Sequence, residues 1–170
     1  KLGDGTTTNS LSPVQVSGLT GATEVTVGLD HSCARKSNGT AFCWGSNASS
    51  QRGNVSASLN AVEFYTSGSI VSIKASGYSS CALLANSTVE CAGSNAWGQN
   101  GIGTNQDSYV NDQPVSGIST ATTIMAGGLE HLCATLSSTE VRCWGNNSDG
   151  QLGTGQSASS DVPIFTDPTP

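Results

Sequence analysis

The sequence predicts an all-β protein made of β-propeller-type blades of about 50 residues, with three full repeats and part of a fourth. The first observation is a pair of cysteines at the same internal spacing in each repeat, with equivalent cysteines recurring after 48 and then 52 residues. The second is a glycine-containing turn motif that opens each repeat, at residues 2–6, 51–53, 99–104 and 151–155. A period near 50 residues is typical of stacked or circular repeat architectures.

Each repeat continues with two apolar stretches that we expect to be strands. Three of the four first stretches contain Pro, which restricts such a strand to a sheet edge or to its first residue, so these are expected to be outer strands. The second stretches are rich in β-branched residues, as buried strands are. The predicted outer strands are residues 13–16, 62–65, 113–115 and 162–165, and the predicted buried strands are residues 24–27, 70–73 and 123–126.

A cysteine hairpin completes each repeat. In the first copy, placing Cys33 opposite Cys43 centres the hairpin on Asn38 and puts Gly39 where a left-handed residue closes the loop. Directly opposed residues lie close enough for a disulfide after a modest twist. The spacing differs from the C-x-x-C pattern that brings two thiolates to one zinc ion, so oxidised pairs are favoured. The predicted disulfides are Cys33–Cys43, Cys81–Cys91 and Cys133–Cys143.

Net charge limits the kinds of partner that the protein can bind, and the cysteines indicate its cellular location. A formal net charge of −6 offers no basic surface for phosphates or anionic lipid, so we expect neither nucleic acid nor membrane insertion. Disulfides predict an extracellular or cell-surface location. The sequence lacks an initiator Met, a signal peptide and a transmembrane run, as expected of a processed product or an excised segment. Five Asn-x-Ser/Thr sequons fit the surface loops of a secreted glycoprotein, at Asn38, Asn47, Asn54, Asn86 and Asn146.

The residues around the cysteines carry a family resemblance. The first copy reads His31-Ser32-Cys33-Ala34, then Asn38-Gly39-Thr40-Ala41-Phe42-Cys43-Trp44-Gly45-Ser46-Asn47, then Gln51-x-Gly53, and the third copy matches better still. This pattern resembles the repeat of the regulator of chromosome condensation family, in its cysteine-containing bacterial form. The middle copy departs from it, with Ser79 in place of His and Ala92 in place of Trp. The resemblance implies a propeller, and such propellers serve as exchange factors, enzyme inhibitors and adhesive or receptor ectodomains.

We expect neither an enzyme nor a metal or cofactor site. His31 and His131 share one repeat position, but Ser79 interrupts the series, so a structural hydrogen bond to a neighbouring turn is favoured over metal binding. No grouping of Ser, His and Asp has an intelligible catalytic motif around it. The exchange-factor activity of the eukaryotic branch is not carried over, because none of its active residues maps onto this acidic chain.

The aromatic residues divide into repeated and non-repeated positions. Trp44 and Trp144 follow the second cysteine of their hairpins and are expected to pack between blades. Non-repeated aromatic residues in loops are better candidates for a contact surface, with ordinary packing as the alternative. These candidates are Tyr65, Tyr78, Trp97 and Tyr109.

Three repeats do not make a ring, since propellers use roughly four to eight blades. We expect other repeats to complete the array, from the same chain or from another copy, and a rotation that fails to close would give a filament. The leading hypothesis is a non-enzymatic extracellular scaffold or adhesive surface with a protein or glycan ligand. The alternative is a protein-binding inhibitor or receptor domain that uses one loop face. The expected repeats cover about 1–50, 51–98, 99–150 and, in part, 151–165, with a linker at 166–170.

Overall fold

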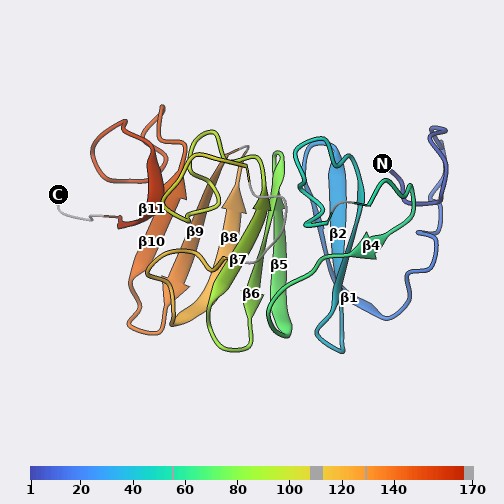
Figure 1. The fold of residues 1–170 in the computed structure, drawn as a ribbon, viewed down its shortest axis with the longest axis horizontal. Helices are drawn as coiled ribbons and strands as arrows, with labels where there is room; N and C mark the ends of the chain where they lie inside the picture. The colour runs from blue at the N-terminus through green and yellow to red at the C-terminus, as the bar shows by residue number, and fades with distance from the viewer. Residues whose placement is uncertain (55, 108–112, 129, 167–170) are drawn as a thin grey trace.

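The structure, a computed structural model, describes residues 1–54, 56–107, 113–128 and 130–166. Its strands form three antiparallel sheets, which we call the first, middle and third blades (Figure 1). The predicted all-β, blade-based fold is therefore confirmed. The first blade contains β1 (Ala22–Val27), β2 (His31–Lys36), β3 (Ala41–Gly45) and β4 (Val62–Glu63). The middle blade contains β5 (Ile70–Ser76), β6 (Ser79–Leu84) and β7 (Val89–Gly93). The third blade contains β8 (Ala121–Gly127), β9 (His131–Leu136), β10 (Val141–Gly145) and β11 (Ser160–Phe165).

Each cysteine hairpin forms at a tip where one residue adopts a left-handed backbone. Gly39, Ser87 and Thr139 occupy this position with φ of 82°, 65° and 69°. The tips leave the two cysteines of each hairpin directly opposite each other, with Cα atoms 4.1 Å apart. The structure contains the disulfides Cys33–Cys43, Cys81–Cys91 and Cys133–Cys143. Every blade thus has its two hairpin strands joined covalently.

The first strands of the three blades lie next to one another, β1 beside β5 and β5 beside β8. The sequence predicts all three as buried, but this is wrong for β1, where Val25 and Val27 are 63% and 67% exposed. The side of β1 that faces β5 is polar instead. The Glu24 carboxylate accepts from the Ile73 N–H at 3.3 Å, and the Thr26 hydroxyl accepts from the Ala75 N–H at 3.0 Å. These side chains satisfy backbone donors at the edge of the middle blade.

Outer strands form where a preceding hairpin offers an edge. β4 pairs with β3, and β11 pairs with β10. In the middle blade, the described residues of the predicted outer strand form one isolated bridge, between Glu90 and Pro114, and Pro114 has no N–H to donate to a ladder. The predicted outer strand at residues 13–16 does not form. Proline therefore marks the edge position without ensuring a strand there.

Two apolar clusters fill the spaces between the blades. The first interface, between the first and middle blades, buries Cys33, Ala41, Cys43, Phe64, Ile70, Ile73, Ala82, Leu84 and Ala92. The second interface, between the middle and third blades, buries Cys81, Leu83, Val89, Cys91, Val115, Ile118, Ala121, Ile124, Leu132, Ala134, Leu136 and Trp144. The middle hairpin therefore contributes one face to the first interface and its other face to the second.

The glycines of the turn motif make room for the tryptophans. The Trp144 indole is fully buried in the second interface, as predicted, and its Nε1–H donates to the Gln99 carbonyl at 2.9 Å. A Cβ at Gly101 would lie 2.8 Å from Trp144 Nε1, so only glycine admits the ring. Trp44 meets Gly3 in the same way, and therefore packs against the N-terminal segment. The glycine–tryptophan pairing explains why both elements recur in the sequence.

Candidate protein-binding surface

A repeated asparagine holds the loop that follows each hairpin. Asn47, Asn95 and Asn147 each lie four residues after the second cysteine. Each side-chain oxygen accepts a backbone N–H five residues further on, at 2.8 to 2.9 Å. Each side-chain amide donates to carbonyls further along, those of Asn54 in the first loop, Thr104 and Gln106 in the second, and Gln156 and Ala158 in the third.

A repeated glutamine reinforces the same loops. Gln51, Gln99 and Gln151 each accept the backbone N–H two residues earlier at 2.9 Å. The loops are therefore fixed by buried or partly buried amides rather than by regular strands. We call this end of the molecule the clamped-loop end. The opposite end, which carries the tips between β2 and β3, β6 and β7, and β9 and β10, is the hairpin-tip end.

The candidate contact residues do not all lie at the same end of the molecule. Trp97, in the clamped loop after β7, is 43% exposed, and Tyr78, in the turn between β5 and β6, is 40% exposed. The Ser94 N–H donates to the Tyr78 carbonyl at 3.0 Å, which joins that turn to the Trp97 loop. Tyr65 follows β4 and lies toward the hairpin-tip end, since the adjacent Phe64 N–H donates to the Ala41 carbonyl. Tyr109 lies outside the described residues.

Trp97 forms one wall of a shallow cavity between the middle and third blades. The cavity measures about 370 Å³ and is lined by Ala96, Trp97, Asn105, Ser159 and Asp161. The loop and β11 approach closely here, because a Cβ at Gly98 would lie 2.3 Å from the Asp161 Cα. We call this site the Trp97–Asp161 pocket. It combines an exposed aromatic side chain with a carboxylate that forms no ion pair among the described residues.

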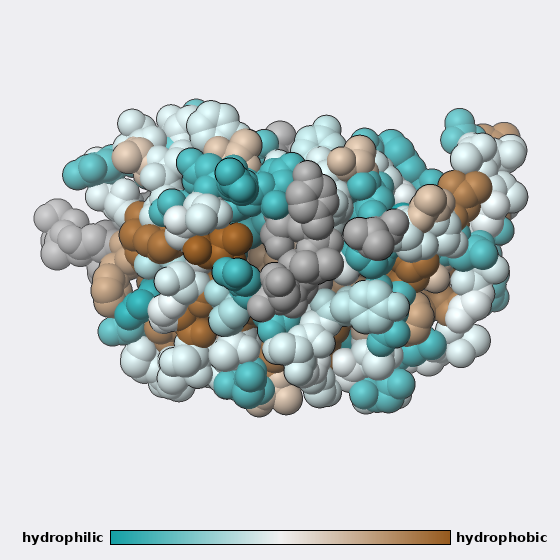
Figure 2. Space-filling model, in the orientation of Figure 1, coloured by the Kyte–Doolittle hydropathy of each residue, from teal (hydrophilic) through white to brown (hydrophobic). Residues whose placement is uncertain are grey.

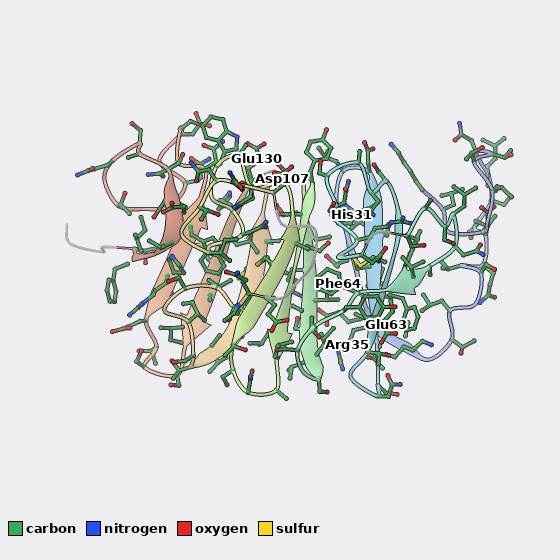
Figure 3. All side chains as sticks on the ribbon, in the orientation of Figure 1. His31, Arg35, Glu63, Phe64, Asp107 and Glu130 are labelled. Carbon is green, nitrogen blue, oxygen red and sulfur yellow. A yellow bond between two sulfur atoms is a disulfide. The ribbon has the colours of Figure 1, made fainter. Side chains whose placement is uncertain are left out.

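Several acidic residues lie at the same end of the molecule as this pocket. The clamped-loop end carries Asp30, Asp107, Glu130 and Asp149 in addition to Asp161. Figure 3 shows Asp107 and Glu130 near this end, whereas Arg35 and Glu63 lie toward the other. Lys1 pairs with Asp30, and Arg52 is buried and donates to the carbonyls of Ser56 and Ser58. The exposed part of this end is therefore predominantly acidic.

His31 is buried and hydrogen-bonded within the fold, as expected of a residue with a structural role. Its ring is buried at the first interface, where Nε2 lies 2.8 Å from the Ser80 hydroxyl, which itself donates to the Gln51 carbonyl at 2.8 Å. Burial lowers the pKa of His31 to about 4, an effect that the charge of Asp30 opposes and that of Arg52 increases. Burial also lowers the pKa of His131. Within the described ranges, no three His, Cys, Asp or Glu side chains are grouped to hold a metal ion.

The five sequon asparagines also have different surroundings. Asn38 and Asn86 lie exposed at hairpin tips, Asn47 and Asn146 are half-buried in clamped loops, and Asn54 is buried.

The described part of the chain contains no helix long and apolar enough to cross a membrane.

The sequence singled out Trp97 as a candidate contact residue but gave no signal for Asp161. Trp97 breaks the repeat pattern, whereas Asp161 is one of twelve acidic residues and has no distinguishing neighbours in the sequence. The two are 64 residues apart and meet only because β11 returns to the edge of the third blade beside the middle-blade loop.

Comparison with known proteins gives two findings. Residues 22–51 and 123–151 match the model of the regulator of chromosome condensation (RCC1) repeat. The fold is similar to that of Prp20p from Saccharomyces cerevisiae, with a TM-score of 0.78 at 18% identity over 89% of this chain. Both findings support the RCC1 repeat family. Human WBSCR16 is also similar, with a TM-score of 0.72 at 20% identity over 85% of this chain. No curated protein matches the sequence.

The two RCC1 repeat matches cover the first and third blades, and the middle copy is the one that departs from the pattern. The chain corresponds to 40% of the Prp20p chain and 39% of the WBSCR16 chain. At these identities the likeness shows the RCC1-type propeller fold.

Proposed function

We propose that this RCC1 repeat protein is a non-enzymatic extracellular binding protein, and that its Trp97–Asp161 pocket takes up a basic side chain of a partner protein. The observation that carries the proposal is the pocket itself, which joins an exposed indole to an unpaired carboxylate on rigidly held backbone. Of the two functions that the sequence predicts, this favours the receptor or inhibitor type, which uses one loop face.

The chemistry of the pocket fits a cation. A guanidinium or ammonium group over an indole face is attracted by the ring, and a nearby carboxylate adds a charge-assisted hydrogen bond. Arg has the further advantage that its planar group stacks on an aromatic ring. The Gln99 side-chain oxygen accepts the backbone N–H of Trp97 at 2.9 Å, so the loop that carries the indole is held before the partner arrives. Such preorganisation reduces the entropy lost on binding.

The acidic residues at the clamped-loop end support the same partner. Asp107, Glu130 and Asp149 lie at the clamped-loop end with few competing cations. A surface of one sign attracts partners of the opposite sign and raises their association rate. Among similar structures, Prp20p has been described with its binding to Gsp1p and histones, and yeast RCC1 (Prp20) bound to Kap60. Use of this fold for protein binding agrees with the proposal.

The extracellular location rests on the three disulfides, which persist in oxidising compartments. Each is closed within one hairpin, so all three form without pairing choices between blades. We therefore place the partner on a cell surface or in the surrounding medium.

The test uses a labelled Arg-Gly repeat peptide and a matched peptide in which citrulline replaces every Arg. Citrulline keeps the shape of Arg but removes its charge. We expect the Arg peptide to bind and the citrulline peptide to bind much more weakly, in fluorescence anisotropy at low salt. Trp97→Ala and Asp161→Asn should each weaken binding about three- to tenfold. Tyr65→Ala, at the hairpin-tip end, is the control and should leave affinity unchanged; equal binding of both peptides would refute the proposal.

A second candidate is head-to-tail assembly, favoured by the outer face of the third blade. This face holds the Cys133–Cys143 side of the hairpin, whose equivalent in the first blade packs against the middle blade. On the third blade Met125 is 68% exposed and Val141 39% exposed. Figure 2 shows apolar atoms on the visible face at the end that carries β10 and β11. Sedimentation over a range of concentrations tests this, since Met125→Lys should abolish any self-association that the unmodified chain shows.

A further inference from the structure

The five sequons differ in whether their amide nitrogen is available. In Asn54 this nitrogen donates to the carbonyls of Arg52 and Glu63 at 2.8 and 3.0 Å, and the residue is 5% exposed. In Asn47 it donates to the Asn54 carbonyl at 2.7 Å. In Asn146 it donates to the Glu130 carboxylate at 3.1 Å. These three amides hold the clamped loops in place.

The side chains of Asn38 and Asn86 are arranged in the same way as each other, and differently from those of the other three sequons. Each side-chain oxygen accepts the backbone N–H and the hydroxyl of the threonine two residues on, at 3.2 and 2.8 Å for Thr40 and at 3.1 and 2.7 Å for Thr88. Neither amide nitrogen donates to another group in the described part of the protein, and both residues are exposed. The threonine hydroxyl thus engages the amide oxygen and leaves the nitrogen facing solvent.

We propose that Asn38 and Asn86 are N-glycosylation sites of this protein and that Asn47, Asn54 and Asn146 are not. The third blade has no counterpart, because its tip reads Ser137-Ser138-Thr139. The inference rests on the exported location given in the proposed function. Of the five sequons that the sequence contains, the proposal selects two, and both lie at one end of the molecule.

The modification needs an oligosaccharide donor on a lipid pyrophosphate. The amide nitrogen forms a bond to the anomeric carbon of the sugar and loses one proton to a base of the transferring enzyme. The carbon–oxygen bond to the pyrophosphate breaks, and the lipid pyrophosphate leaves with its electron pair. A glycan on Asn54 would displace two hydrogen bonds from a buried position, so a chain modified there does not reach this fold.

The position of the two sites adds a consequence for binding. Both lie at the hairpin-tip end, and the Trp97–Asp161 pocket lies at the clamped-loop end. Glycans at the tips would cover the end that carries Tyr65 and leave the acidic end open. The molecule would then present one sugar-covered end and one protein-binding end.

The test expresses the full chain behind a cleavable signal peptide in eukaryotic cells and measures site occupancy by peptide mapping after enzymatic deglycosylation in heavy-oxygen water. We expect label at Asn38 and Asn86 and none at the other three. Asn38→Gln and Asn86→Gln should each remove one glycan from the intact mass, and Asn146→Gln should remove none. Site occupancy is also measured by peptide mapping on protein that stays inside the cell, once its three disulfides have been shown to be present.

Two outcomes overturn the proposal: folded chain with three disulfides but no sugar at Asn38 or Asn86, or label at Asn54 in folded chain. Arg-Gly peptide binding is measured on the same sample before and after deglycosylation and should change by less than about twofold. Absence of peptide binding both before and after deglycosylation, with both sites occupied, would contradict the proposed function alone, which keeps the two failures distinguishable.

Discussion

The first and second interfaces use the same repeat positions but different chemistry. Where the second interface has Trp144 and Leu132, the first has Ala92 and Ser80. The first interface compensates with polar contacts, from His31 to Ser80, from Ser80 to the Gln51 carbonyl, and from Glu24 to Lys74. One repeat fold therefore accommodates an apolar and a partly polar blade contact.

This difference shows how the middle copy can depart from the pattern without losing the fold. Ser79 and Ala92 are departures within the middle hairpin, yet every residue of β6 and β7 is buried. The smaller side chains at Ser80 and Ala92 face the first blade, which supplies the imidazole of His31 from across the interface. A change at one blade is thus matched by a residue on its neighbour.

Trp144→Ala should produce the largest loss of stability and would show how much the apolar interface contributes. Removing a fully buried Trp typically costs about 3 to 5 kcal/mol of unfolding free energy, and here it also removes the bond to the Gln99 carbonyl. Denaturant unfolding measures the change. Trp44→Ala is the matched control and should cost less, because that ring packs on the N-terminal segment instead of between two blades. Equal losses would remove the distinction between the two positions.

Mild acid should weaken the first interface selectively. The pKa of His31 is about 4 in the folded protein, whereas an unfolded histidine titrates near roughly 6.5. Between these values the unfolded chain binds a proton that the folded chain does not. Unfolding free energy therefore falls as pH falls, by about 2 to 3 kcal/mol between pH 7 and pH 4.5. Denaturant unfolding at a series of pH values measures this loss.

The control for the acid effect is His31→Gln, which cannot titrate and should flatten the pH dependence in this range. His131→Gln should flatten it less, since His131 is only half-buried. The pKa values of Asp4 and Glu24 are also lowered, so their contribution is lost only at more acidic pH. A pH profile that His31→Gln leaves unchanged would show that His31 is not the group responsible.

The features that recur in every repeat could be predicted from the sequence. The features that depend on a single contact between blades could not. Period, cysteine pairing and β-branched stretches depend on local spacing, so the blades and hairpins follow from them. The exposure of Val25 and Val27 and the missing strand at residues 13–16 depend on which edges lie nearby, which spacing does not encode. The pairing of Trp97 with Asp161 and of His31 with Ser80 likewise arises only when separate blades meet.

Ser80→Ala tests whether the polar contact is needed at the first interface. It leaves the buried His31 Nε2 without its partner, which should cost about 1 to 3 kcal/mol. Ser32→Ala is the control, since Ser32 occupies the equivalent position in the first blade and is only half-buried. Its cost should stay within about 0.5 kcal/mol. If Ser80→Ala were as mild as the control, the first interface would depend on its apolar cluster alone.

Glu24→Gln should have the smallest effect and the clearest dependence on salt. Burial raises the pKa of Glu24, but hydrogen bonds from Lys74 and Ser72 outweigh it and leave that pKa below its usual value. Its carboxylate lies 2.7 Å from Lys74 Nζ and 3.4 Å from Arg35 Nε, with all three side chains partly exposed. Such pairs contribute about 1 kcal/mol or less, and salt screens them. We expect the difference in unfolding free energy between the unmodified chain and Glu24→Gln to shrink from low salt to about 1 M salt. The corresponding difference for Trp144→Ala should remain, because removing a buried indole does not depend on screening. A salt-independent cost at Glu24 would mean that its bonds to Ser72 and to the Ile73 N–H, rather than its charge, join β1 to β5.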